Sequence, residues 1–132
     1  MLIDNSLMND LMAKAQASPR LRMNFDLRTS PQDNSQRMLN AMLPGTELPI
    51  HRHTASTEVV VILRGRMDEI FFDEQGRETE RFHLDPTTGN CALSIPLGMW
   101  HTVEVFEPTV IFEAKDGAYA PLAPEDVLVA AS

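Results

Sequence analysis

The stretch from Gly45 to Gly65, GTELPIHRHTASTEVVVILRG, places two histidines and a glutamate directly before an apolar run. Residues 59–63 are β-branched or aliphatic, which is typical of a buried strand. His51 and His53 are two residues apart, so an extended chain directs both imidazoles to one face. Glu58 has the opposite parity, but a bend in the small, polar residues 54–57 would reset it. These three side chains can therefore converge on one point.

A second stretch, IPLGMWHTVEV at residues 95–105, supplies a further histidine. Pro96 and Gly98 favour a tight turn, and the strand that follows alternates. His101 shares a face with Val103 and Val105, whereas Glu104 faces the other way. If the valines face the interior of the protein, His101 does too.

Three imidazoles and one carboxylate form a recognised set of ligands for a divalent metal such as Zn, Fe, Mn or Ni. A glutamate in an apolar strand is costly to bury without a partner, and a cation supplies one. The alternative is that the histidines are ordinary surface or turn residues. The predicted metal ligands are His51, His53, Glu58 and His101, and neutral imidazole ligation predicts that metal affinity falls below about pH 6. We expect His83 to be a surface residue.

Short strand-like segments separated by turns occupy most of the chain from Arg22 onward. About eight of them recur every eight to twelve residues, which is typical of an all-β sandwich or small barrel. They are preceded by an amphipathic helix, NSLMNDLMAKAQAS, for which Asn5 or Ser6 is the expected cap. We therefore expect a lead-in at residues 1–20 and one barrel domain at residues 21–132. The segment APEDVLVAAS is expected to be a last strand or an arm.

Composition excludes several classes of function. The chain has 132 residues, a net charge of -8 and one cysteine. The negative charge argues against nucleic acid and membranes as partners, since both attract basic patches. We expect Cys91 to be buried and inert. The start of the chain, MLIDNSLMND, lacks the pattern of a signal peptide, and a cytoplasmic location is expected.

The two motifs resemble those of the cupin superfamily. The first cupin motif is matched completely, whereas the second has one extra residue before Pro96, and Val105 replaces an asparagine that is not a metal ligand. The resemblance implies a double-stranded β-helix (jelly-roll) barrel that holds one divalent metal. The matching residues are Gly45, His51, His53, Glu58, Gly65, Gly89, Pro96, Gly98 and His101.

Beyond the motifs, residues 22–124 resemble the WbuC family of cupin-fold metalloproteins. The resemblance rests on QRMLNAMLPGTELPIHRH, VVILRGR, IPLGMWHTVEVFEP and FEAKDGAYAP. It implies a link to bacterial surface polysaccharide (O-antigen) biosynthesis, with no assigned reaction. It also suggests that Arg37 and Asn40 line the cavity and that Tyr119 closes it. Solvent-facing or packing roles for Arg37 and Tyr119 remain the alternatives.

Two functions follow from these observations. One is a metalloenzyme, an isomerase, hydrolase or dioxygenase, acting on a small polar molecule such as an anion or a sugar nucleotide. The other is a binding or regulatory module without turnover. No general base is evident, and Glu47 and Glu104 are candidates only by their proximity in sequence. The resemblance to cupins, which commonly pair their barrels, also suggests a homodimer.

Overall fold

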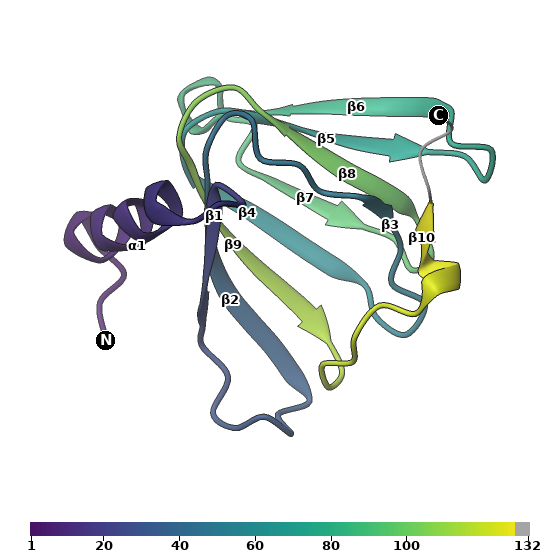
Figure 1. Cartoon of the computed structure of the whole chain (residues 1–132), viewed down its shortest axis with the longest axis horizontal. Coiled ribbons are helices and arrows are strands. Elements are labelled where there is room, and N and C mark those ends of the chain that lie inside the picture. The colour runs from purple at the N-terminus through teal and green to yellow at the C-terminus, as the bar shows by residue number, and fades with distance from the viewer. Residues whose placement is uncertain (129–132) are drawn as a thin grey trace.

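The computed structural model describes residues 1–128, which form one helix, ten strands and two short 3-10 helices (Figure 1). The elements in chain order are α1 (Asn5–Ala17), β1 (Arg22–Asp26), β2 (Ser35–Met42), β3 (Ile50–His51), β4 (Glu58–Arg64), β5 (Met67–Phe72), β6 (Glu78–Leu84), η1 (Pro86–Thr88), β7 (Ala92–Ile95), β8 (Trp100–Val105), β9 (Thr109–Asp116), η2 (Pro124–Asp126) and β10 (Val127–Leu128).

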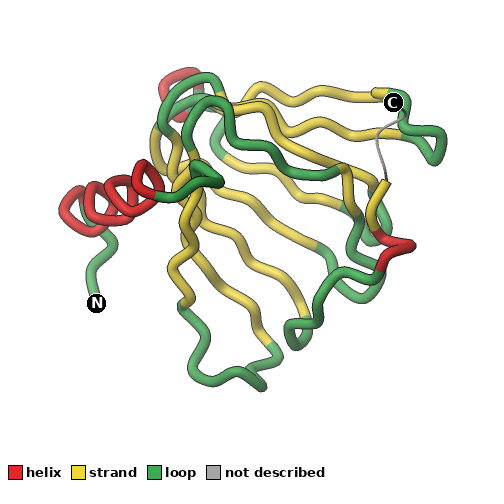
Figure 2. Tube along the Cα trace, in the orientation of Figure 1, coloured by secondary structure: helices red, strands yellow, loops and turns green. Residues whose placement is uncertain are grey.

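Two five-stranded antiparallel sheets face each other (Figure 2). One has the strand order β1-β2-β9-β4-β7 and the other β10-β3-β8-β5-β6. Successive strands frequently belong to different sheets, as β3 and β4 do, so the chain crosses between the sheets as it does in a jelly roll. The predicted all-β jelly-roll barrel with a short N-terminal helix is confirmed. The short strand β3 adds to the segments that the sequence predicted, and β10 lies in the predicted last strand or arm.

Helix α1 covers the outer face of the first sheet. Leu11, Met12 and Ala15 are buried and pack against the outward side chains of β1 and β2. The guanidinium of Arg64 donates to the amide oxygens of Asn5 and Asn9 and thereby fastens the helix to β4. The cap differs from the prediction, because the carboxylate of Asp4, one residue earlier, accepts the N–H of Leu7. No helix in the described part of the chain is long and apolar enough to cross a membrane.

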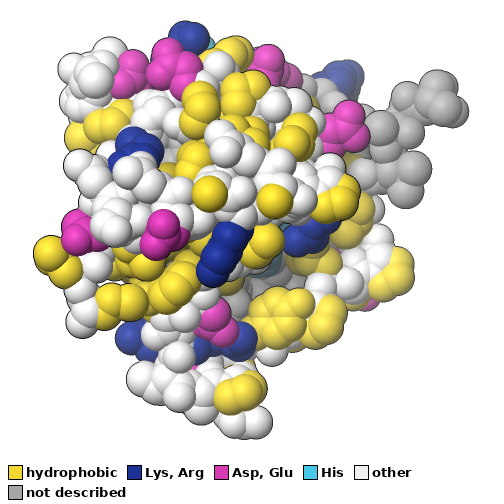
Figure 3. Space-filling model, turned by 60° about the vertical axis from the view of Figure 1, so that its left-hand side comes forward, with side chains coloured by type: hydrophobic (Ala, Val, Ile, Leu, Met, Phe, Trp, Pro, Cys, Tyr) yellow, Lys and Arg dark blue, Asp and Glu magenta, His cyan; other side chains and the backbone are white. Residues whose placement is uncertain are grey.

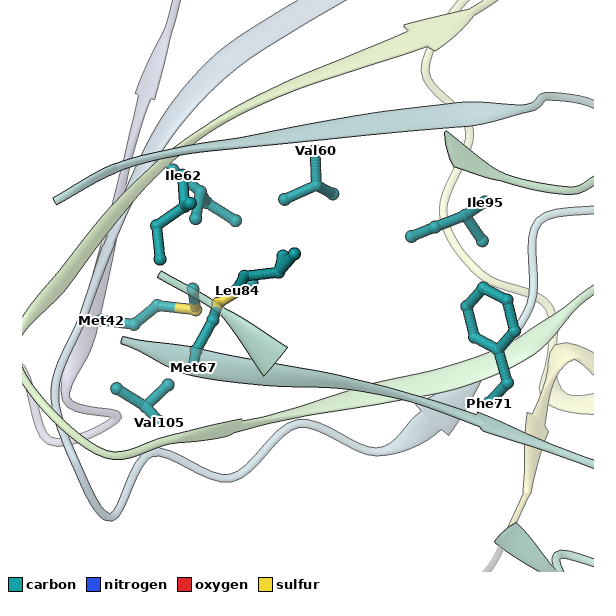
Figure 4. Close-up of a cluster of buried hydrophobic side chains, with 9 residues drawn as sticks. Met42, Val60, Ile62, Met67, Phe71, Leu84, Ile95 and Val105 are labelled. Atoms are coloured by element: carbon teal, nitrogen blue, oxygen red, sulfur yellow. The ribbon is translucent and has the colours of Figure 1, made fainter. Parts of the chain in front are cut away.

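The core between the sheets is built from alternate residues of facing strands (Figure 4). Val60 and Ile62 of β4 point toward Met67 and Phe71 of β5, and Val105 lies beside them. These side chains fill one end of the interior. The same alternation places polar residues at the other end, since Glu58 precedes Val60 on β4 and His101 precedes Val105 on β8.

The turn between β4 and β5 lies very close to the start of β9. Gly65 has a φ of +91°, and a Cβ at this position would lie 2.3 Å from the carbonyl oxygen of Pro108. Only glycine tolerates both the left-handed conformation and this contact. The surface elsewhere is mixed, because acidic, basic and hydrophobic side chains are interspersed on the face shown in Figure 3.

Candidate metal centre

The structure brings three imidazoles together at the polar end of the interior. His51 of β3 lies opposite His101 of β8 in the register of the second sheet, and His53 follows two residues later. Their ring centroids are separated by 4.3 to 5.6 Å. One nitrogen from each ring can be chosen so that all three lie within 4.8 Å of one another. This spacing allows one ion to contact all three rings.

Backbone carbonyls orient two of the rings. The Nδ1–H of His51 donates to the carbonyl of Pro49 at 2.9 Å, and that of His101 donates to the carbonyl of Met99 at 2.8 Å. A carbonyl can only accept, so Nδ1 carries the proton in both rings. The Nε2 lone pairs are therefore free for a ligand, which is the usual arrangement of metal-bound histidine.

Glu58 reaches the same point from the opposite sheet. The chain leaves the second sheet after His51 and enters the first at Glu58, so the residues between them provide the predicted bend. Glu58 is 3% exposed. Its Oε1 lies 3.3 Å from the Nε2 of His101 and 3.7 Å from the Nε2 of His53. Strand parity does not apply to Glu58 and His51, because they belong to different sheets.

Two buried atoms in this cluster lack hydrogen-bond partners. They are the Nε2 of His53 and the Oε1 of Glu58, and both face the centre of the cluster. An unsatisfied buried polar atom is costly, and a single cation would satisfy both of these atoms. The residues present therefore fit a divalent metal of the kind that nitrogen and oxygen ligands bind.

The electrostatics also suit a cation. Burial, with the nearby charges of His101 for His51 and of Lys115 for His53, lowers the pKa of both imidazoles to about 4. Burial opposes ionisation of Glu58, but His101 and Lys115 outweigh it and hold its pKa below the ordinary value. Neutral imidazoles and an ionised carboxylate are the protonation states that metal ligation requires.

Three further charged residues in the interior were missed by the sequence analysis: Glu69, Glu113 and Lys115. Lys115 Nζ lies 3.8 Å from Glu58 Oε2. Burial and the charge of Glu58 raise the pKa of Glu113 to about 8, and burial raises the pKa of Glu69 well above its usual range. Parity groups Ile111, Glu113 and Lys115 on one face of β9, but only the pairing of β9 with β4 shows that this face points inward.

Glu113→Gln is expected to stabilise the metal-free protein by about 2–4 kcal/mol near pH 8. The pKa of Glu113 is raised from an ordinary 4.5 to about 8, so between these values the folded state keeps a proton that the unfolded state releases. Stability therefore falls as pH rises through this window, and glutamine removes that loss. Urea unfolding at pH 5, 6.5 and 8 measures the effect. Glu80→Gln, at an exposed position, is the control; equal pH slopes in wild type and Glu113→Gln would contradict the assignment.

A cavity of about 360 Å³ opens beside the histidines. One wall of it is the C-terminal segment, residues 118–128, which crosses the end of the barrel and adds β10 to β3 (Figure 1). We call this space the mouth cavity. It is lined by Gln36, His51, Arg52, His53, Thr54, Ala55, Ser56, Lys115, Ala118, Tyr119, Ala120, Pro121, Leu122 and Asp126.

Arg52, between the two histidines of the motif, holds this segment in place. Its Nε donates to the carboxylate of Asp126 at 2.9 Å, and its backbone N–H donates to the carbonyl of Asp126 at 3.0 Å. Its guanidinium also stacks on the ring of Trp100, 4.5 Å from the centroid. The charge of Arg52 is thus already matched within the protein.

The three predicted ligand-contacting residues lie in different places. Tyr119 lines the mouth cavity and is 58% exposed. Asn40 is buried with Met42 on the inner face of β2, and its Oδ1 has no hydrogen-bond partner. Arg37 lies outside the cavity and pairs with Asp33 at 2.6 Å. Its neighbour Gln36 lines the cavity instead, because Arg37 and Asn40 are three residues apart on a strand and cannot share a face.

The remaining sequence predictions have mixed outcomes. Glu104 faces outward and pairs with Arg81, as its parity predicted. His83 is exposed, and its Nδ1 lies 2.7 Å from Asp68.

The prediction that Cys91 is buried is wrong: the residue precedes β7 and is exposed. Its apolar neighbours belong to the strand, whereas Cys91 itself lies in the turn. Of the predicted last strand or arm, Pro124–Asp126 forms η2 and Val127–Leu128 forms β10, whereas residues 129–132 lie outside the described residues.

Comparison with protein families gives one match. A family model described as "Domain of unknown function (DUF6016)" matches residues 3–84. This region includes His51, His53 and Glu58 and ends before His101. No curated protein matches the chain.

Several solved structures share the fold of this chain, and one of them is named as a cupin. The capsular polysaccharide assembling protein CapF from Staphylococcus aureus has a TM-score of 0.65 and 19% identity over 79% of this chain and 30% of its own. A cupin 2 domain-containing protein from Halorhodospira halophila has a TM-score of 0.60 and 18% identity over 77% and 68%. Lactobacillus farciminis oxalate decarboxylase, in a formate complex, has a TM-score of 0.58 and 17% identity over 74% and 29%.

The chain spans less than a third of the length of CapF. At such identities the likeness establishes the fold, which is a cupin fold. CapF also occurs in a structure with the inhibitor 3-isopropenyl-tropolone, so this neighbour binds a small molecule.

Proposed function

We propose a function for this chain, which belongs to the DUF6016 family, a domain of unknown function, from the chemistry of its interior. It is a metal-binding cupin-fold protein that holds one divalent ion, Zn, Fe, Mn or Ni, through His51, His53, Glu58 and His101. One observation carries the proposal: the Nε2 of His53 and the Oε1 of Glu58 are buried without partners and face the same point.

The proposed ligand is a small polar, sugar-related molecule that enters the mouth cavity. The name of CapF, a capsular polysaccharide assembling protein, and the resemblance to the WbuC family support a role in bacterial surface polysaccharide biosynthesis. A bound metal would supply Lewis acidity or an activated water. The residues of this chain hold the ion, and the C-terminal segment limits the access of water.

A metal-dependent binding module without turnover is the second candidate. One observation favours it. Within residues 1–128, the only carboxylate that lines the mouth cavity is that of Asp126, and this carboxylate is already paired with Arg52. The ion would then anchor a ligand without chemistry. Thermal-shift measurements with a panel of sugar nucleotides, followed by product analysis of each binder, separate the two candidates. Binding with no product favours the module.

The remaining parts of the proposal concern the whole molecule. We propose one barrel domain over residues 21–132 with a helical lead-in at residues 1–20, a homodimer and a cytoplasmic location. The packing of α1 onto β1 and β2 supports the proposed division into one barrel domain and a helical lead-in. Light scattering measures the oligomer, and cell fractionation measures the location.

Protein purified without an affinity tag should contain about one divalent metal ion per chain. The physical reason is that the unpartnered nitrogen and oxygen in the cluster are satisfied only when an ion is present. Elemental analysis identifies the metal and its stoichiometry. Protein that arrives metal-free and then binds none of Zn, Fe, Mn or Ni in calorimetry would refute the site.

Metal affinity should fall most steeply near pH 4. Burial holds the pKa of His51 and His53 at about 4, so protons displace the metal from these two ligands only in that range. This is about two pH units below the value expected from unperturbed histidine. A chelator competition series with circular dichroism at each pH measures it. A loss of affinity that is complete by pH 5 would contradict the lowered pKa values of His51 and His53.

A further inference from the structure

Lys115 lies in the wall of the mouth cavity and forms a loose ion pair with the buried carboxylate of Glu58. It is one of two lysines in the chain, and its side chain is only 16% exposed. Within residues 1–128 its ammonium donates no hydrogen bond, and the carboxylate oxygen of Glu58, at 3.8 Å, is too far away for one. A poorly solvated ammonium with three free donors is costly unless a partner is supplied.

A bound metal would leave this charge without compensation. Among residues 1–128, the only carboxylate paired with Lys115 is that of Glu58, which is also the proposed anionic ligand of the metal. When an ion takes up the charge of Glu58, the metal and Lys115 become two neighbouring positive centres. Arg52 and Asp126 cancel each other and contribute nothing to the balance. An anion between the ion and Lys115 would compensate both positive centres.

We propose that the metal position and Lys115 together form a subsite for an oxyanion group, a carboxylate or phosphoryl group, of the small-molecule ligand. One oxygen of the group faces the ion and another accepts hydrogen bonds from Lys115. This inference rests on the proposed metal site and names the chemical class of its ligand. The hydroxyls of Thr54 and Ser56 line the same cavity and suit the polar remainder of the molecule.

The competing explanation is that Lys115 only balances the buried carboxylates. Glu58 lies beside it, and Glu113 is two residues away on the same face of β9. In that case Lys115 would contribute to stability and would have no effect on ligand binding. The two explanations therefore differ in whether removing the ammonium changes the affinity for anions in metal-loaded protein.

The test uses Co²⁺-loaded protein, whose visible spectrum reports directly on the ligands of the ion. Wild type, Lys115→Met, Lys115→Gln and Lys115→Arg are titrated with lactate, with inorganic phosphate and with neutral propylene glycol. Lys14→Met, which removes the other lysine from the exposed face of α1, is the matched control. Metal content is measured for every variant before titration.

We expect an anion to perturb the spectrum of wild type, and Lys115→Met and Lys115→Gln to weaken that binding about tenfold or more. The anion affinity of Lys115→Arg and Lys14→Met should stay within about threefold of wild type. Propylene glycol should not change the spectrum of any variant. A stronger response to lactate or to phosphate identifies the oxyanion. Equal anion affinity in all metal-loaded variants, or no anion binding to metal-loaded wild type, would overturn the subsite. Failure of wild type to bind Co²⁺ would instead refute the proposed metal site.

Discussion

Replacing both His51 and His53 with alanine is expected to abolish stoichiometric metal binding. The double variant removes two of the four proposed ligands, including the ring whose Nε2 is buried without a partner. Each well-placed ligand contributes several kcal/mol to a site of this kind, so the affinity should fall by at least about a thousandfold. Isothermal titration with the metal found in native protein measures the loss.

The control for this experiment is His83→Ala. His83 is exposed on β6, outside the barrel, and pairs with Asp68 rather than with the cluster. This variant should retain one metal per chain. Retention of stoichiometric metal by His51→Ala/His53→Ala, with a native circular dichroism spectrum, would show that other residues hold the ion.

Gly65→Ala is expected to be the most destabilising single-methyl change in the turns of the barrel, by about 3–5 kcal/mol. The added Cβ would lie 2.3 Å from Pro108 O and 2.7 Å from Thr109 Cα. Both atoms are backbone, so the start of β9 would have to move. The positive φ adds about 1–2 kcal/mol. Urea unfolding at pH 7 measures the total.

The variant Gly89→Ala separates the cost of the steric contact from the cost of the positive φ. Gly89 has a φ of +85°, close to that of Gly65, but no atom lies within 4 Å of its would-be Cβ. This variant carries only the backbone strain and should lose about 1–2 kcal/mol. If both variants lose the same amount, the close approach at Gly65 contributes nothing.

Much of the fold and the metal cluster can be predicted from spacing. Some features can be interpreted from the local sequence alone, without knowledge of the neighbouring strands. They are the interval between His51 and His53, the glycine at position 65 and the Pro96–Gly98 turn. The observed bend between His53 and Glu58 is likewise implied by small polar residues. Such features predict which side chains converge because a strand has only two faces.

Features that depend on neighbouring strands were harder to predict. Glu113 and Lys115 belong to a segment that reads as an ordinary amphipathic strand, and only the pairing of β9 with β4 reveals that this polar face points inward. The resemblance suggested that Arg37 and Asn40 both line the cavity, although their spacing of three residues on one strand excludes a shared face. The exposure of Cys91 depends on where β7 begins, and strand ends are poorly defined by sequence.

The division of the interior into an apolar end and a polar end has a practical consequence. The contacts that stabilise the barrel lie around Met67 and Ile111, whereas Thr54, Ser56 and Leu122 line the cavity and lie outside that core cluster. Saturation libraries at these three rim positions should therefore yield mostly folded clones. Variants that bind new ligands could then be selected without first increasing the stability of the protein.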